Sequence, residues 1–280
     1  VSTPSVDPLE ADASPAEGAY INRCLSAAFV PGSVFKLVTS AAAIENISGL
    51  ENETFYCEGE YKIAGVPITC MRAHGEQTFE QALANSCNCT FARLAVRIGQ
   101  DAMVNYVREY GFLDSQSLDG IRTAKGSYPT EFVGDPEIGW SGIGQSTDLV
   151  CPYSMLRFVS AIANGGILIE PKLINDGSTP VAERYMEAST AARLKQYMSY
   201  NAVTSYDSEN NFPGLNICAK TGTAETGDGS SNAWFVGFLD DDEHPYAFVT
   251  MVERGGSGLS VAGTVTNKYL QDYLKYLNGQ

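Results

Sequence analysis

The first long apolar stretch of the chain follows a helical rhythm. Positions 34, 37, 38, 41, 42 and 44 are apolar, and almost no charge appears before Glu45. Apolar residues three and four apart share one face of a helix, and a run with so little charge suits a helix buried on most sides. The pattern predicts a buried helix over residues 34–46, with Ser33 held rigidly at its N-terminus.

Further helices are predicted by start and stop signals. Thr78 and Gln81 have the spacing of a capping box, so a helix begins there and ends near residue 86. Glycines and an opening proline mark the limits of the others. These helices are predicted over residues 90–98, 101–110 and 152–163. Residues 86–88 therefore fall in a tight connection between two helices.

Beyond residue 200 the pattern becomes that of strands. The apolar runs 215–221, 232–239 and 246–253 predict three strands, and the short acidic turn 240–244 makes the last two antiparallel. The final stretch, 263–277, has apolar residues at close to helical spacing and is predicted to pack on the sheet.

Together these elements predict an α+β fold, an antiparallel β-sheet covered by helices with an all-helical subdomain inserted. Residues 1–280 form one domain in this interpretation. The helical subdomain spans roughly residues 50–200, and the sheet subdomain combines residues 1–50 and 200–280. Residues 112–148 lack periodicity and are rich in Gly, Ser, Asp and Pro, which predicts a long irregular surface segment.

Composition narrows the function more than the fold. The 280 residues are 44% hydrophobic, enough for a sizeable core, and carry a net charge of −15. That charge argues against nucleic acid and against an anionic membrane surface as partners, because both are also negative. Apolar runs end well before 18 residues, so no transmembrane helix is expected, and no signal peptide opens the chain.

Seven cysteines are too few for a disulfide-built scaffold. Cys57 and Cys70 flank what is predicted to be two short strands around a turn at Gly65, and we expect a disulfide between them; two free half-buried thiols are the alternative. Closing that loop would stabilise the fold by roughly 3 kcal/mol. There is no C-x-x-C motif and there are only two histidines, so neither a metal nor another cofactor is expected.

Ser33 and Lys36 are three residues apart at the start of the first predicted helix. This spacing places both side chains on one helix face, a turn apart. A lysine that loses its proton on burial can take a proton from a hydroxyl, so the pair is a candidate nucleophile and base. The alternative is an N-capping serine followed by a solvated lysine.

Two further motifs favour the interpretation of Ser33 and Lys36 as a catalytic pair. Ser86-Cys87-Asn88 lies 53 positions after Ser33, and Lys220-Thr221-Gly222-Thr223 begins 134 positions after Ser86. The ordered set S-x-x-K, S-x-N, K-T-G resembles the signature of the penicillin-recognising serine acyltransferases. Segments that extend the resemblance to the transpeptidase domain of class B penicillin-binding proteins, over nearly the whole chain, are 1–8, 21–23, 142–145, 163–166 and 233–238.

Acyl transfer needs a nucleophile, a base, a proton route and oxyanion donors. Ser33 is expected to attack the carbonyl and Lys36 to accept its proton, with Ser86 relaying that proton toward the departing amine. Asn88 could fix the lysine or a substrate amide through hydrogen bonds. Helix capping and turn formation are the alternative roles for Ser86 and Asn88.

The Lys220–Thr223 motif ends a predicted strand. A lysine, two hydroxyls and a glycine suit a substrate with a terminal carboxylate whose backbone lies along a strand. The resemblance implies that Lys220 and Thr221 support the relay and the carboxylate, and that Thr223 contacts the carboxylate beside Gly222. It also implies that the backbone amides of Ser33 and Thr223 form the oxyanion hole.

The resemblance implies a peptidoglycan D,D-transpeptidase that forms a serine acyl-enzyme on D-Ala-D-Ala stem peptides and is inhibited by β-lactams. Expected partners are the stem peptides, β-lactam antibiotics and, through parts outside this chain, a membrane glycan polymerase. Because the chain begins with Val and already resembles the first core strand over Val1–Pro8, we interpret it as part of a longer protein. That protein is expected at the extracytoplasmic face of the bacterial cell membrane, with its anchor outside this chain.

Three alternatives share the motifs: a D,D-carboxypeptidase, a serine β-lactamase and a non-catalytic β-lactam sensor. A β-lactamase needs a second base over the acyl carbonyl, and Glu131 and Glu137 lie in the irregular segment where one could be placed. One residue departs from the resemblance, since Cys151 stands where a polar residue or threonine usually precedes the proline.

Overall fold

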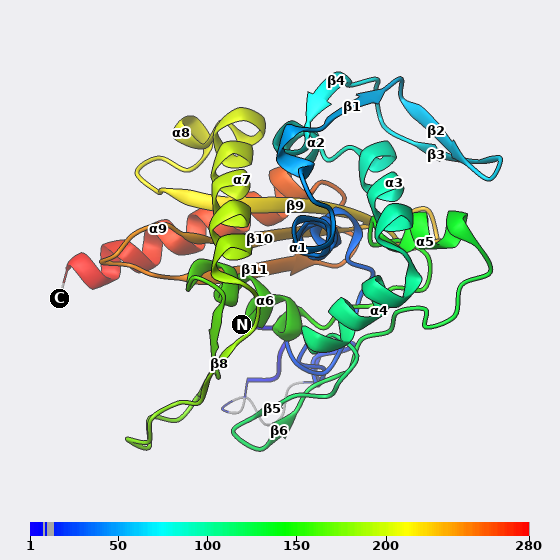
Figure 1. Cartoon of the computed structure of the whole chain (residues 1–280). Coiled ribbons are helices and arrows are strands. Elements are labelled where there is room, and N and C mark those ends of the chain that lie inside the picture. The colour runs from blue at the N-terminus through cyan, green and yellow to red at the C-terminus, as the bar shows by residue number, and fades with distance from the viewer. Residues whose placement is uncertain (8, 10–13, 280) are drawn as a thin grey trace.

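The computed structural model describes residues 1–7, 9 and 14–279. At its centre is an antiparallel sheet in the order β11-β10-β9, drawn in yellow to orange in Figure 1. Its strands are β9 (Ile217–Glu225), β10 (Ser231–Leu239) and β11 (Ala247–Val252). Trp234 of β10 pairs with Gly222 of β9 and with Met251 of β11. The three strands predicted after residue 200 are therefore confirmed, and β9 forms an edge of the sheet.

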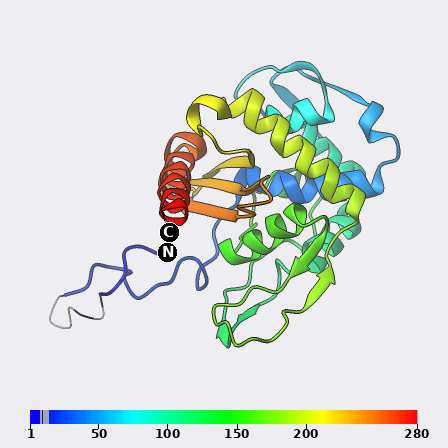
Figure 2. The ribbon, with the colours of Figure 1, turned by 90° about the vertical axis from the view of Figure 1, so that its left-hand side faces the viewer.

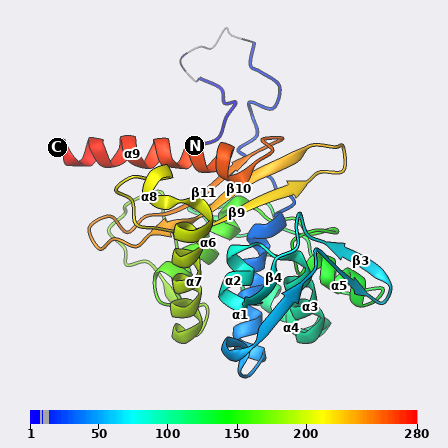
Figure 3. The same cartoon turned by 90° about the horizontal axis from the view of Figure 1, so that it is seen from above.

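Helices cover both faces of this sheet. A π-helical turn, η3 (Gly258–Gly263), leads into α9 (Thr264–Asn278), which lies along one face. Figures 2 and 3 show α9 on one side of the strands and α1, α6 and α7 on the other. The other helices of the described residues are η1 (Gly32–Phe35), α1 (Lys36–Asn46), η2 (Leu50–Asn52), α2 (Phe79–Ala84), α3 (Asn88–Ile98), α4 (Gln100–Glu109), α5 (Asp135–Ser141), α6 (Pro152–Ala163), α7 (Ala188–Tyr206) and α8 (Ser208–Asn211).

The block between the two ends of the chain also contains strands. Four two-stranded sheets lie in it, so the expectation of an all-helical insertion was wrong in that detail. They pair β1 (Thr54–Cys57) with β4 (Gly75–Thr78), β2 (Glu60–Ile63) with β3 (Val66–Thr69), β5 (Ser117–Leu118) with β6 (Ile121–Arg122), and β7 (Ile167–Ile169) with β8 (Ala182–Arg184). The pair β2–β3 is the hairpin predicted around Gly65.

The helix predicted over residues 34–46 is confirmed and passes through the centre of the molecule. Every residue from 34 to 43 is buried, including Lys36 at its start. Thr78 caps α2 with the predicted capping box, because its hydroxyl accepts from Gln81 N while the Gln81 side chain accepts from Thr78 N. Helix α1 therefore begins next to the candidate nucleophile, Ser33, and α2 leads into the turn that carries Ser86.

Residues 1–7 correct one expectation, since they form no strand; Pro8 lies outside the described residues. Most of these seven residues are exposed, and they include Pro4, which has no N–H to donate to a sheet. Such a segment offers no apolar face to bury. Within the part of the chain that is described, no helix is both long and apolar enough to cross a bilayer.

Candidate active site

The first two candidate residues meet as their spacing predicts. Ser33 lies in η1, which runs directly into α1, and Lys36 is the first residue of α1. Lys36 Nζ lies 3.0 Å from Ser33 Oγ. The serine is half-buried, whereas the lysine has no exposed surface. The alternative of a solvated lysine is therefore excluded by the structure.

The turn between α2 and α3 brings two more polar side chains to the same amine. Lys36 Nζ lies 3.1 Å from Ser86 Oγ, 2.7 Å from Ser86 O and 2.6 Å from Asn88 Oδ1. Ser86 has φ +52°, a left-handed backbone conformation that non-glycine residues adopt at a cost and that clusters at functional sites. Asn88 Nδ2 donates to Thr69 O at 2.8 Å, which fixes the amide.

A second buried lysine approaches from the sheet. Lys220 Nζ donates to Ser86 Oγ at 3.1 Å and to Thr221 O at 3.0 Å. Ser86 therefore lies between the amines of Lys36 and Lys220, and a continuous chain of contacts runs from Ser33 through Lys36 and Ser86 to Lys220. All residues predicted to act in proton transfer are brought together.

Burial controls the charge of both amines. It lowers the pKa of Lys36 from 10.5 to about 8, although the neighbouring thiols of Cys87, Cys70 and Cys89 act in the opposite direction. Burial also lowers the pKa of Lys220 well below its ordinary value, and the charge on Lys36 adds to this effect. A neutral lysine able to accept a proton is therefore accessible near neutral pH.

The predicted substrate strand lies directly against the nucleophile. A Cβ on Gly32 would lie 3.0 Å from Thr223 O, so the backbones of η1 and β9 adjoin. Thr223 is exposed and Thr221 half-buried, and among the described residues no strand pairs with the outer side of β9. An extended peptide can therefore pair with this edge while its carbonyl carbon faces Ser33.

Two residues that support Thr221 were not predicted from the sequence. Tyr206 Oη, at the end of α7, accepts from Thr221 N at 2.8 Å and from Asn201 Nδ2 at 2.8 Å. Its own proton is then available to Thr221 Oγ1, 3.0 Å away. Burial raises the pKa of Tyr206, which keeps the phenol protonated. The apolar spacing of residues 191, 194, 198 and 202 was the signal that could have revealed this helix.

The predicted disulfide between Cys57 and Cys70 is wrong in this structure. Both cysteines are free, and their sulfur atoms are 3.8 Å apart, whereas a disulfide needs about 2.05 Å. The hairpin does bring the two ends together as expected. However, Cys70 Sγ also lies 3.8 Å from Cys87 Sγ and 3.4 Å from Cys89 Sγ, so it belongs to a shared cluster and not to an isolated pair.

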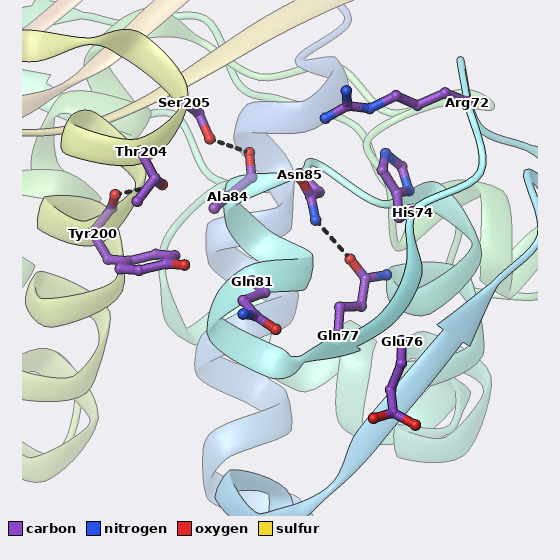
Figure 4. Close-up of a pocket in the computed structure, with 10 residues that line it drawn as sticks. All are labelled: Arg72, His74, Glu76, Gln77, Gln81, Ala84, Asn85, Tyr200, Thr204 and Ser205. Atoms are coloured by element: carbon purple, nitrogen blue, oxygen red, sulfur yellow. Dashed lines mark hydrogen bonds between the residues drawn. The ribbon is translucent and has the colours of Figure 1, made fainter.

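A polar pocket of about 510 Å³ opens beside the turn that carries Ser86. Figure 4 shows it between α2, α7 and the segment that leads into β4, where Asn85 Nδ2 donates to Gln77 Oε1. It contains none of the predicted catalytic residues. The lining residues are Arg72, His74, Glu76, Gln77, Gln81, Ala84, Asn85, Tyr200, Thr204 and Ser205.

A family model and curated relatives both match this chain, and they agree on one protein family. The family model for the penicillin binding protein transpeptidase domain matches residues 1–271. Stage V sporulation protein D of Bacillus subtilis is 29% identical over 94% of this chain and 44% of its own length. Peptidoglycan D,D-transpeptidase PbpA of Mycobacterium tuberculosis is 28% identical over 86% of this chain and 53% of its own. The chain thus spans about half the length of these relatives.

Solved structures share the fold. The ceftriaxone acyl-enzyme complex of penicillin-binding protein A from M. tuberculosis superposes with a TM-score of 0.84 at 25% identity, over 97% of this chain and 69% of that one. The D,D-transpeptidase domain of a peptidoglycan glycosyltransferase from Eggerthella lenta gives 0.82 at 23% identity, over 97% and 71%. The α+β fold predicted from the sequence is confirmed.

Proposed function

Since the chain belongs to the penicillin-binding protein transpeptidase family, we propose that it is the catalytic part of a peptidoglycan D,D-transpeptidase. Its substrates would be stem peptides ending in D-Ala-D-Ala, and β-lactams would acylate it in their place. One observation carries the proposal: the contacts that join Ser33, Lys36, Ser86 and Lys220 beside the open edge of β9.

Acylation follows from these contacts. Ser33 Oγ attacks the carbonyl carbon of the donor peptide while its proton moves to the neutral amine of Lys36, 3.0 Å away. The bond between that carbon and the terminal D-Ala nitrogen then breaks. Ser86 donates its hydroxyl proton to the leaving nitrogen and takes one from Lys36, so D-Ala leaves as a neutral amine and Ser33 holds the acyl group.

The K-T-G segment binds the donor. The peptide would pair with the outer edge of β9, and its terminal carboxylate would accept hydrogen bonds from Thr221 and Thr223 near the Lys220 amine. Gly222 is needed for the close fit, because a Cβ there would lie 2.8 Å from Pro31 O. An amine from a second stem peptide would then attack the acyl carbon and reverse the proton steps.

The fate of the acyl group distinguishes a transpeptidase from a β-lactamase. Glu137 is used structurally, since its Oε2 accepts from Val133 N at the start of α5, and Glu131 is exposed. Neither carboxylate is in hydrogen-bond contact with Ser33. This arrangement favours transfer to an amine over rapid hydrolysis by water.

The place of action follows from the substrate. Peptidoglycan lies outside the cytoplasmic membrane, so we place this domain at the extracytoplasmic face of the bacterial cell membrane, with a glycan polymerase as partner through parts outside this chain. The division into a helical subdomain near residues 50–200 and a sheet subdomain stays a proposal of the same kind.

The test is incubation with benzylpenicillin followed by intact mass over time. We expect a long-lived adduct of one penicillin, no adduct with Ser33→Ala, and an unchanged adduct with Ser160→Ala, a matched substitution on α6. Rapid loss of the adduct would instead identify a β-lactamase, and no adduct would identify a non-catalytic module. Transfer of a D-Ala-D-Ala donor to glycine as acceptor then separates transpeptidase from carboxypeptidase activity.

A further inference from the structure

Four potential metal ligands converge behind the Ser86 turn. One ligand atom from each of Cys57, Cys70, His74 and Cys87 lies within 4.8 Å of the other three. Cys57 ends β1, Cys70 follows β3, His74 precedes β4, and Cys87 precedes α3. No sequence pattern indicated this cluster, because its members come from separate segments and form no C-x-x-C motif.

The spacing of the sulfur atoms is that of a tetrahedral zinc site. Thiolates bound about 2.3 Å from Zn²⁺ at tetrahedral angles lie about 3.8 Å apart. The distances from Cys70 Sγ to Cys57 Sγ and to Cys87 Sγ are both 3.8 Å. The same distances are far too long for a disulfide.

The imidazole gives a second, independent observation. His74 Nδ1 is buried and has no hydrogen-bond partner among the described residues. A buried nitrogen without a partner is unfavourable, and binding a metal would satisfy it. Figure 4 shows the ring of His74 at the pocket, near Asn85.

Neighbouring groups donate hydrogen bonds to two of the sulfur atoms. Cys89 N donates to Cys70 Sγ at 3.4 Å, and Thr90 Oγ1 donates to Cys87 Sγ at 3.3 Å. Hydrogen bonds of this kind orient metal ligands and neutralise part of their charge. Cys89 Sγ, 3.4 Å from Cys70 Sγ, is a fourth thiol beside the cluster.

We propose that Cys57, Cys70, His74 and Cys87 bind one Zn²⁺ ion. Three Zn–S bonds and one Zn–N bond form, each of the three thiols releases its proton to solvent, and no electron is transferred. Soft thiolate donors with one imidazole at tetrahedral spacing select zinc over magnesium or calcium. With all four positions filled by protein, the ion is structural.

The ion would fix the turn that carries the catalytic residues. Cys87 stands between Ser86 and Asn88, and Asn88 Nδ2 donates to Thr69 O, next to Cys70. Binding both Cys70 and Cys87 therefore locks β3 and the turn together, with Ser86 and Asn88 held toward Lys36. Metal binding is independent of the proposed function; only this effect on acylation rests on it.

The first experiment measures the metal directly. The 280-residue chain is purified without added metal or chelator, and zinc is counted per chain by elemental analysis. We expect about one equivalent, removed by a strong chelator under reducing conditions. Co²⁺ added to the metal-free protein should give thiolate charge-transfer bands and the intense d–d bands of tetrahedral cobalt, and zinc should abolish them. Protein without zinc that also gives no cobalt bands when fully reduced would overturn the proposal.

Paired variants identify the ligands. His74→Ala and Cys57→Ser should weaken metal affinity at least tenfold, and Thr90→Val should weaken it about 10- to 100-fold through the lost hydrogen bond to Cys87. His244→Ala and Cys24→Ser, which replace half-buried residues of the same types elsewhere, should not change it. Equal zinc content in His74→Ala and His244→Ala would contradict the assignment of His74.

A final measurement tests the link to the turn. Metal-free protein and His74→Ala should react with penicillin at least tenfold more slowly, with the rate restored by zinc in the former alone. If one equivalent of zinc binds but does not change the rate of reaction with penicillin, the metal site stands and its role in positioning the turn is refuted. Loss of the penicillin adduct in the zinc-loaded protein would refute the proposed function and leave the metal site intact.

Discussion

Lys36 has more polar contacts than its protons can satisfy. Four oxygen atoms surround its amine, from Ser33, Asn88 and both oxygens of Ser86, while an ammonium has three protons and a neutral amine two. When Lys36 is neutral, its nitrogen lone pair can accept a hydrogen bond from one of the two hydroxyls, Ser33 Oγ or Ser86 Oγ. In the proposed reaction Ser33 Oγ is the hydroxyl that loses its proton, and this geometry suits Lys36 as the base.

This requirement predicts how acylation depends on pH. The pKa of Lys36 is lowered to about 8 by burial, so its neutral fraction falls tenfold per pH unit below that value and saturates above it. The second-order rate constant for acylation by penicillin should rise with pH from 6.5 and level off above about 8. This rate constant is measured by rapid mixing, quenching at set times and intact mass spectrometry of the acylated protein.

The Ser33→Ala variant serves as the control at each pH, because any loss of penicillin in its presence comes from hydrolysis by hydroxide and not from acylation of Ser33. Lys36→Arg should lose about 10²- to 10⁴-fold at all pH values, because arginine keeps its charge and cannot act as a base. A rate that is flat between pH 6.5 and 9 would show that Lys36 does not take the proton.

Tyr206 supports the site from behind, and its hydroxyl satisfies two buried donors. Tyr206→Phe leaves Thr221 N without a partner and removes one bond from Asn201 Nδ2, which still donates to Ala219 O at 2.8 Å. We expect the free energy of unfolding to fall by about 1–3 kcal/mol. Urea denaturation measures it. Tyr200→Phe is the control on the same helix, since the Tyr200 hydroxyl forms no hydrogen bond within the described residues, and an equal loss in both variants would contradict the assignment.

Sequence motifs located the candidate catalytic residues but not the residues that support them. Ser33, Lys36 and Lys220 could be predicted because an ordered set of short motifs is specific. Tyr206 and the cluster around Cys70 could not, since a supporting role depends on which segments meet in space. A phenol or a thiol carries no local sign of its distant partner.

At the scale of elements, the close packing of η1 on β9 sets the distance between nucleophile and substrate. Gly222 makes this approach possible, because an ideal Cβ there would lie 2.8 Å from Pro31 O and 3.0 Å from Val34 Cγ1. Backbone and a buried valine cannot move away at little cost. Any side chain at this position must push η1 and β9 apart.

Gly222→Ala should therefore reduce both stability and acylation. We expect a loss of about 1–3 kcal/mol from overpacking, and an acylation rate about 10- to 100-fold lower because Ser33 is displaced from the strand edge. Thermal unfolding and penicillin kinetics measure the two effects. Gly263→Ala is the control, because its Cβ would lie 3.3 Å from the tip of Leu259, 3.5 Å from Phe212 and 3.7 Å from Gly258 O, with no contact as short as those at Gly222. Normal acylation in Gly222→Ala would show that this contact does not set the geometry.

Elements were predictable where one signal dominated. The uncharged run of α1 and the capping box of α2 gave helices at the expected places. The helix α7 was missed because polar side chains such as Thr190 and Asn201 are buried within its inner face, which weakens the apolar stripe. The short α5 lies in the segment expected to be irregular, and Pro136 in its first turn was its one clear signal.

At the scale of the whole molecule, the candidate site lies where the helical layer meets the edge of the sheet. Ser33 comes from η1, which leads into the central helix α1, Ser86 from the turn between α2 and α3, and Lys220 from β9. Helix and strand patterns predicted both layers, but patterns alone do not fix how layers dock. The ordered motifs supplied that information, because three segments that share one reaction must meet.

The net charge of −15 acts on the whole fold and gives a final prediction. Like charges repel in the compact state, and added salt screens this repulsion. Salt also weakens exposed ion pairs such as Arg254–Asp228 and Arg193–Glu51, but such pairs contribute at most about 1 kcal/mol each. With 33 acidic and 18 basic side chains, repulsion should dominate.

The thermal midpoint at pH 7 should therefore rise as sodium chloride increases from about 10 to 150 mM, the range over which the Debye length falls from about 30 to 8 Å. At pH 5.5, closer to the pI of about 4.5, the rise should be smaller because the net charge is lower. Scanning calorimetry at both pH values measures the difference, and a midpoint that falls with salt at pH 7 would show that the ion pairs outweigh the repulsion.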